Sequence, residues 1–571
     1  MYQRIILFFA VVLLGTAGLN AQKERKVSFV GGALSTLNNN TLIVRDSLPD
    51  STTAKRNSGG YALIDLGVNI KPNKHTEIMG MFRIKNNFGG FWGSGVSFDV
   101  RQLWVKGVVA NAVRYQIGDI NLKQTPFTLF NHHADQIDSL PSIFSLQRNI
   151  VNDEKFYLDN HSWRMQGANV DFGFTFSKYV KEANFNAFIT RLNATNFSTI
   201  PDRLMGGISI QLIQSNKFSM SYNGNSVFDV KGTIIDSNVF KNVIHTVDWK
   251  YITAVGKNTL SFNGEYGTSK YLYTADTLAP KLNDYFINIF TQLSVSKLNL
   301  KATLGYLNVG PDFRSIGSQS KDVNYNAPPV YFNRYTNSQQ IRPITLFDII
   351  SNENIYNHTI SSALASENPA FNYVLPYGMA TFNRVGAYAK LQYLSKKLLA
   401  VHAEYFNLSE IRGQGSKEYK HFSIVKVFSN IPINSFFHYK KTIAFQLGVN
   451  SQSSKRTSNE VIEKVDLKMM HLNAGLRWEL FTNFELLAGF ISQSTRGYDF
   501  SADRNSYGEV TYFNLNHYDL NQEIKALGIR YNFSEKAYLC ALYQQSSYQD
   551  KLKKNADFTM NQFGIIYNIT L

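Results

Sequence analysis

The carboxyl-terminal stretch, residues 559–571, alternates large apolar side chains with small or polar ones. One face of an extended strand there would carry Phe563, Ile565, Tyr567, Ile569 and Leu571. On the other face, from Gln562 to Thr570, Ile566 is the single large apolar residue. Because successive side chains of a strand point to opposite sides, this pattern predicts an amphipathic β-strand. A transmembrane barrel must pair its last strand with its first; the alternative is an edge strand of a soluble sandwich.

The amino-terminal end predicts export. Arg4 precedes an apolar run of about fifteen residues, and Ala21 follows, which is typical of a secretory signal peptide cleaved after Ala21. We therefore expect a signal peptide over residues 1–21 and a transmembrane β-barrel over 22–571. Beyond the signal no apolar run approaches the length of a membrane helix. Cys540 is the single cysteine, so an intramolecular disulfide is excluded.

The connections between the alternating segments are short and long in turn. Short connections occur at residues 71–74, 109–112, 214–217, 255–258 and 533–536, among others. Long ones cover residues 123–162, 309–378 and 493–521. Tight periplasmic turns and long extracellular loops are typical of outer-membrane barrels. The pattern predicts an all-β, single antiparallel barrel of about 22 strands, with 18 to 20 left open because the connection near residues 430–441 is long for a turn.

The apolar row that ends at Leu571 resembles the carboxyl-terminal assembly signal of bacterial outer-membrane barrels, although that family favours a terminal Phe. The usage of Asn, Lys and Tyr and the Leu-Asn-Ala-Gln end of the signal resemble porin-type barrels of Bacteroidota. The resemblance implies the outer membrane of a Gram-negative bacterium, with lipid, lipopolysaccharide and the barrel assembly machinery as partners, and possible contacts with other outer-membrane proteins. TonB-dependent receptors carry a plug domain before the first strand, for which this chain has no room.

Several segments show a polar row opposite an apolar row. A charge facing lipid near the membrane midplane costs about 2–4 kcal/mol, so the polar row is expected to face the lumen. The predicted pore-lining residues are Asp248, Lys250, Glu265, Lys301, Arg384, Lys390, His402, Glu404, Arg477 and Arg530. The net charge of +16 would fit nucleic acid, but the cations are scattered without a basic helix or run, so we expect no nucleic-acid partner.

No spacing marks a catalytic site. His132, His133, Asp135 and Asp138 could bind a metal, but a polar surface loop is the preferred interpretation. His402 and Glu404 could form an acid and base pair, but a lumen salt-bridge lining is preferred. We therefore expect no enzyme activity, metal or cofactor.

The preferred function is a porin-like channel for passive passage of small polar or anionic solutes or oligosaccharides. The alternative is a non-conducting barrel that serves as scaffold or accessory subunit of a secretion or outer-membrane assembly complex. The loop 309–378 is expected to occlude the pore at least in part, or else to stand outward as a binding surface.

Overall fold

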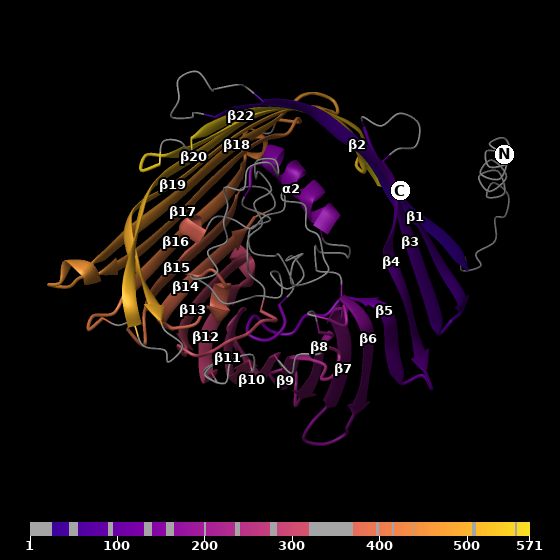
Figure 1. The fold of residues 1–571 in the computed structure, drawn as a ribbon. Coiled ribbons are helices and arrows are strands. Elements are labelled where there is room, and N and C mark those ends of the chain that lie inside the picture. The colour runs from indigo at the N-terminus through magenta and orange to yellow at the C-terminus, as the bar shows by residue number, and fades with distance from the viewer. Residues whose placement is uncertain are drawn as a thin grey trace.

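The computed structural model describes residues 26–44, 55–88, 95–130, 140–155, 165–198, 201–234, 240–273, 282–318, 369–395, 399–413, 416–437, 439–504, 510–553 and 557–570. These residues form one 22-stranded antiparallel sheet that closes on itself (Figure 1). The first eleven strands are β1 (Val27–Val44), β2 (Lys55–Asn73), β3 (Thr76–Asn87), β4 (Val96–Val109), β5 (Val113–Ile120), β6 (Met165–Thr175), β7 (Glu182–Asn193), β8 (Arg203–Ile213), β9 (Phe218–Asp229), β10 (Phe240–Val255) and β11 (Asn258–Tyr273). The other eleven are β12 (Leu282–Val295), β13 (Leu300–Val309), β14 (Arg384–Leu394), β15 (Ala400–Ser409), β16 (His421–Pro432), β17 (Ile443–Arg456), β18 (Val465–Phe481), β19 (Phe484–Arg504), β20 (Val510–Ser534), β21 (Ala537–Asp550) and β22 (Phe558–Thr570). The predicted all-β barrel is confirmed, at the upper end of the expected strand count.

The last strand closes the barrel against the first. Ile565 lies opposite Leu37, Tyr567 opposite Ser35 and Ile569 opposite Ala33 in the β1–β22 pairing. Closure leaves no sheet edge, which a barrel in lipid requires because unpaired backbone groups are costly there. Phe563 is 46% exposed on the outer face. The expected role of this row as an assembly signal stays a prediction, and Leu571 lies outside the described residues.

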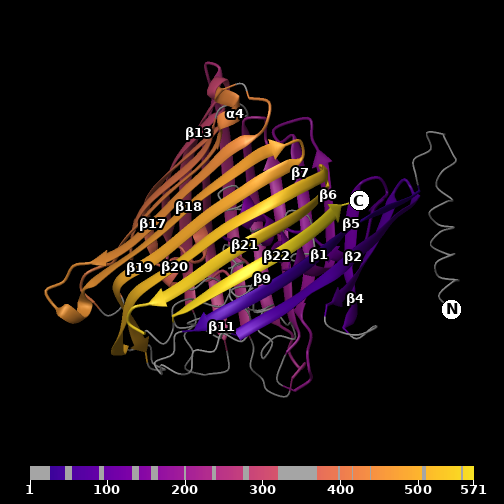
Figure 2. The same cartoon turned by 90° about the horizontal axis from the view of Figure 1, so that it is seen from above.

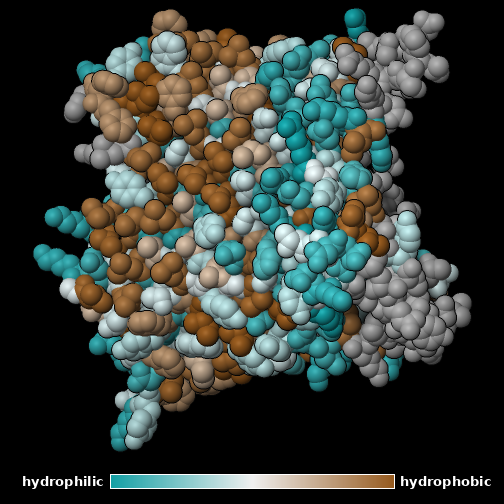
Figure 3. Space-filling view, turned by 90° about the vertical axis from the view of Figure 1, so that its left-hand side faces the viewer, coloured by the Kyte–Doolittle hydropathy of each residue, from teal (hydrophilic) through white to brown (hydrophobic). Residues whose placement is uncertain are grey.

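The two faces of the strands differ as the alternation predicts. In β11, Phe262 and Tyr266 are exposed on the outside, whereas Ser261 and Glu265 are buried on the inside. Figure 3 shows a broad hydrophobic area on one exterior face, bordered by a hydrophilic zone. An outer apolar band and a polar interior are the arrangement of transmembrane barrels. In the part of the chain that the structure describes, no helix is long and apolar enough to cross a membrane.

The connection near residues 430–441 joins two separate strands, β16 and β17. It contains the short helix α4 (Ile433–Phe436), so β16 and β17 are two crossings. The predicted loop 493–521 is wrong in extent. β19 and β20 stay paired from Phe484 opposite Tyr531 to Arg504 opposite Val510, and Figure 2 shows these long strands. Polar residues such as Arg496, Asp499 and Asp503 interrupt the hydropathy alternation in this stretch, while backbone pairing continues.

Part of the chain folds inside the ring of strands. Helix α2 (Ser142–Lys155) crosses the interior in Figure 1. Its Ile143 and Phe144 pack with Leu487 and Ile524 of the inner wall. The remaining described helical turns are η3 (Ser296–Leu298), η5 (Pro369–Phe371), η6 (Gly378–Ala380) and η7 (Val461–Glu463).

Three further stretches, residues 121–130, 310–318 and 369–383, line the inner wall and are called the interior segments below. Phe127 stacks on the wall residue Phe286 with ring centroids 3.9 Å apart. The backbone of Ile316 donates to Asn242 at 3.1 Å, and the Tyr373 hydroxyl donates to the carbonyl of Leu467 at 2.9 Å. The described ends of the predicted loop 309–378 therefore occupy the interior, while residues 319–368 lie outside the described part.

Candidate solute pathway

A row of polar side chains crosses the inner wall from β14 to β19. Register places Lys390 opposite Glu404, Glu404 opposite Lys426, and Lys426 opposite Asn450. The row continues through His471 and Gln493. All six share the inner face because residues directly opposite in an antiparallel pair point to the same side. The row gives the lumen a polar surface on adjacent strands.

The β14 end of this row is a compact charged group. Glu404 Oε1 lies 3.0 Å from Lys390 Nζ and 3.1 Å from His402 Nε2. The sequence placed all three in the lumen, and the structure brings them together. Lys390 neutralises Glu404, so this contact is a lining ion pair and offers no free base. Lys426, opposite Glu404 on β16, makes no hydrogen bond or short ion pair with the described residues, but its positive charge also acts on Glu404.

Arg477 and Arg530 both bind the carboxylate of Glu485, a residue that the sequence analysis did not single out. Arg477 Nη2 lies 2.6 Å from Glu485 Oε1, and Arg530 binds the other oxygen of the same carboxylate. Glu485 is 5% exposed, whereas Arg477 is 38% exposed. Burial of a carboxylate between two guanidinium groups is favourable because each oxygen has a charged donor. One net positive charge remains at this place.

Asp248 and Glu265 lie directly opposite each other on β10 and β11. Asn223 Nδ2 donates to Asp248 Oδ1 at 2.9 Å, and the Thr125 hydroxyl donates to Glu265 Oε1 at 2.6 Å. Because Thr125 belongs to an interior segment, Glu265 is covered rather than open to the lumen. Lys250, two residues after Asp248 in β10 and on the same face, is exposed.

Lys301 and Arg384 are both on the inner face but in different surroundings. Lys301 is exposed and lies opposite Gln392. The Arg384 guanidinium donates to the Val374 carbonyl at 3.0 Å and stacks on the Phe422 ring at 3.7 Å. An interior segment therefore covers Arg384. Val374 belongs to an interior segment and Phe422 to β16 of the wall, so the guanidinium lies between the folded-in chain and the wall. The predicted pore-lining role of Arg384 stays a prediction.

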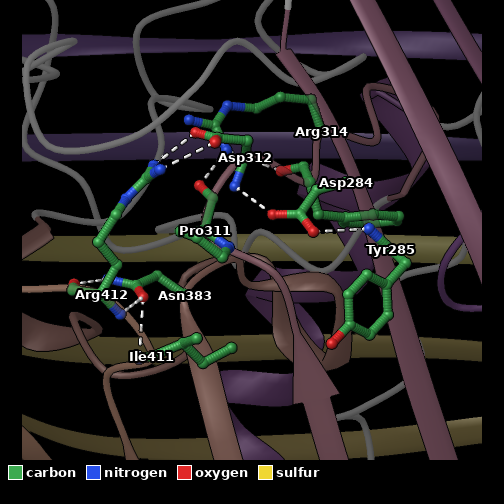
Figure 4. Close-up of polar contacts among 9 residues, drawn as sticks. Asp284, Tyr285, Pro311, Asp312, Arg314, Asn383, Ile411 and Arg412 are labelled. Atoms are coloured by element: carbon green, nitrogen blue, oxygen red, sulfur yellow. Dashed lines mark hydrogen bonds and ion pairs between the residues drawn. The ribbon is translucent and has the colours of Figure 1, made fainter. Parts of the chain in front are cut away.

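The interior segments are tied to the rim of the barrel through Asp312 and Arg412 (Figure 4). Arg412 donates two hydrogen bonds to the Asp312 carboxylate, at 2.6 and 3.0 Å. Asp312 N donates to Asp284 Oδ2 at 2.8 Å. Asn383 Oδ1 accepts the backbone N–H groups of Ile411 and Arg412 at 3.0 and 2.9 Å. These bonds join the chain after β13, the chain before β14 and the β15–β16 connection.

Arg314 extends this anchor inward. Its guanidinium donates to the carbonyls of Pro311 and Phe313 and lies 4.1 Å from the Phe382 ring centroid. Burial lowers the pKa of Arg314, and the hydrogen bond to Asp312 raises the pKa of Arg412. A small pocket beside Arg314, lined also by Tyr271, Tyr377 and Phe382, has room for about one water molecule. It is too small to hold a solute.

Register explains why some lining residues escaped the sequence analysis. The hydropathy of their own segments does not distinguish Lys426 and Glu485 from other strand residues. The groups that lie next to these two side chains are known only from the pairing with the neighbouring strands. On the opposite wall Asp65 binds Arg83 at 2.6 Å and lies 3.5 Å from Arg101, a group that sequence alternation also left out. The described residues hold no cluster of metal-binding side chains. His132, His133, Asp135 and Asp138 lie outside them.

Comparison with known proteins returned no matching family model and no matching curated protein. Among solved structures, Pseudomonas aeruginosa OccK8 (OprE) aligns with a TM-score of 0.35 and 8% identity, over 95% of this chain and 98% of that chain. Acinetobacter baumannii OccAB1 aligns with a TM-score of 0.31 and 9% identity, over 95% and 97% of the two chains. The P pilus usher (PapC) translocation pore gives 0.33 and 8%, over 95% and 100%. At these scores the overlap carries no functional information, and the barrel architecture stands on the strand pairing of this chain itself.

Proposed function

We propose that the chain is an outer-membrane channel for passive passage of small polar solutes, with a preference for anions. The observation that carries the proposal is the set of exposed cations on the inner wall. Lys250 and Lys301 are exposed, and Lys390 is 34% exposed. Cations in a water-filled passage raise its potential and enrich anions there. Export through residues 1–21, insertion by the barrel assembly machinery, and contact with lipid and lipopolysaccharide belong to the same proposal.

The interior segments and α2 restrict the passage. They cover Arg384, Glu265 and the apolar wall residues Phe286 and Leu487. They leave Lys301 exposed and Lys390 and His402 partly exposed. The solute route that we propose therefore follows the uncovered part of the wall. Such a route would exclude large molecules by size while admitting small hydrated anions.

Planar-bilayer recording of the purified full-length barrel tests this function. We expect stable single-channel conductance in potassium chloride and a reversal potential that indicates modest anion preference. The preference should fall with increasing salt, because the Debye length is about 10 Å at 0.1 M and about 3 Å at 1 M. A folded protein that never conducts would contradict the channel.

One observation favours the alternative, a scaffold or accessory subunit. The inner wall is packed against chain over much of its surface, as the buried clusters around Phe127 and Phe144 show. A barrel built only as a membrane anchor has no need for an open lumen. Absence of conductance together with co-purification of a defined outer-membrane or periplasmic partner would favour this function.

A further inference from the structure

The end of the barrel with the short turns carries a dense set of exposed lysines. The turns β2–β3, β6–β7, β8–β9, β10–β11, β12–β13, β16–β17 and β20–β21 all contribute. The exposed lysines there, called the short-turn lysines, are Lys71, Lys74, Lys178, Lys181, Lys217, Lys257, Lys297, Lys440 and Lys536. They come from turns distributed around the barrel, so their charges form a ring.

Most of these lysines have no charged partner within the described chain, and the charge of Lys71 acts on Glu77 without a direct contact. None of the nine ammonium groups makes a hydrogen bond or ion pair with a described residue. The same turns contain one described carboxylate, Glu535, and Glu77, Glu182 and Glu479 lie in strands close to these turns. Nine lysines therefore outnumber four nearby carboxylates, so the ring carries a net positive charge that the described chain offsets only in part.

The opposite end of the barrel is different. There, Arg412 binds Asp312 at 2.6 Å, Lys420 binds Asp499, and Lys551 lies 3.6 Å from Asp519. Cations at that end are thus often matched by carboxylates. The contrast between the two ends indicates that the short-turn lysines meet an external anion.

Exposed aromatic and aliphatic side chains accompany the lysines. Tyr179 is 91% exposed, Phe437 78%, Phe481 68%, Phe533 55% and Leu298 53%. Aromatic side chains at the end of an apolar band lie among lipid headgroups, and lysines there extend their ammonium groups toward the polar surface. Binding of a soluble acidic protein would account for the exposed lysines but not for the exposed aromatic and aliphatic side chains beside them.

We propose that the ring of short-turn lysines binds the phosphate groups of anionic phospholipids in the leaflet that surrounds this end of the barrel. A lysine near an anionic lipid surface contributes about fivefold to partitioning, so nine distributed lysines select anionic over zwitterionic lipid. The surface would hold a shell of anionic lipid around the barrel and set its depth in the membrane. This inference does not depend on conductance.

Native mass spectrometry of the folded full-length barrel in neutral detergent tests the proposal. The probes are phosphatidylglycerol and phosphatidylcholine of the same acyl chains. We expect several-fold more phosphatidylglycerol bound, and loss of most of that preference in a variant carrying Lys178→Gln, Lys217→Gln, Lys257→Gln and Lys297→Gln. Higher ammonium acetate concentration should reduce the preference of the native protein.

A matched control changes the same net charge at the other end of the strands. Lys231→Gln, Lys241→Gln, Lys270→Gln and Lys455→Gln remove exposed lysines that also make no described ion pair, and this variant should keep most of the preference. Equal losses in both variants, or equal binding of the two lipids to the native protein, would overturn the proposal. Binding of poly-glutamate that phosphatidylglycerol does not displace would overturn it in favour of a soluble acidic partner. Heat-modifiable migration of each variant verifies that the barrel is folded.

Discussion

Arg412 and Asp312 join the β15–β16 connection to the chain that follows β13 through two parallel hydrogen bonds, at 2.6 and 3.0 Å. The backbone N–H of Asp312 in turn donates a hydrogen bond to the carboxylate of Asp284 in β12. The pair thus fixes the start of the interior segment 310–318 to the barrel rim. Because Arg412 is 56% exposed, its contribution is expected to concern the position of this segment more than global stability.

Arg412→Ala should release the start of segment 310–318. We expect larger or noisier single-channel conductance, with a loss of stability of roughly 0.2–1 kcal/mol, as for exposed ion pairs. Arg496→Ala is the control, since Arg496 pairs with Asp519 at 3.4 Å away from the interior segments. Identical currents for native protein and Arg412→Ala would show that this anchor does not govern the passage.

Phe286→Ala should detach two interior segments at once. The Phe286 ring lies 3.9 Å from Phe127 and 5.1 Å from Phe313, centroid to centroid, and the residue is fully buried. Truncation of such a core aromatic costs about 3–5 kcal/mol. We expect a lower temperature for the heat-modifiable transition and a larger conductance. Leu304→Ala, on the outer face at 69% exposure, should leave the conductance unchanged; an equal change there would argue against the interior packing.

Charge reversal of the exposed lumen lysines should change ion selectivity. Lys301→Glu with Lys390→Glu is expected to shift the reversal potential toward cation preference, most strongly at low salt because screening is weak there. Arg384→Glu should instead hinder folding, since its guanidinium is enclosed by Val374 and Phe422 and a carboxylate would meet carbonyl acceptors. A folded Arg384→Glu barrel with the larger selectivity shift would contradict this placement.

Cysteine labelling tests the orientation. Cysteines at Asn216 and Lys257, in short turns, should resist a membrane-impermeant thiol reagent on whole cells, because we expect these turns in the periplasm. Cysteines at Lys231 and Ser458, in outer connections, should react. The native Cys540 is buried and should remain silent. Permeabilised cells provide the control, in which all four positions react, and the reverse pattern on whole cells would invert the topology.

Deletion of residues 567–571 should block barrel closure. It removes the pairing of Tyr567 with Ser35 and of Ile569 with Ala33, and with it the last three residues of the apolar row that we expect the assembly machinery to recognise. Western blots of outer-membrane fractions should lack a heat-modifiable species. Asn568→Ala, an inner-face change in the same strand, should still assemble. A truncated protein that assembles normally would refute the role of this strand end.

Local sequence pattern determined the class of fold. Alternation with a period of two is a property of each strand by itself, and lipid requires every strand to obey it, so the barrel, the lumen-facing row and the closing strand could be predicted. The loop predicted over residues 493–521 marks the limit of this approach. Polar residues interrupt the alternation there, yet β19 and β20 stay paired, because backbone hydrogen bonds do not depend on side-chain hydropathy.

The tertiary structure alone decided which lumen residues meet and which are covered. Glu485 joins Arg477 to Arg530 of the next strand, and Thr125 reaches Glu265 across 140 residues of sequence. Arg384, which alternation assigns to the lumen as firmly as Lys390, is covered by an interior segment. Such contacts depend on strand register and on where a returning loop packs, and these are set by residues distant in the chain, so no local pattern encodes them.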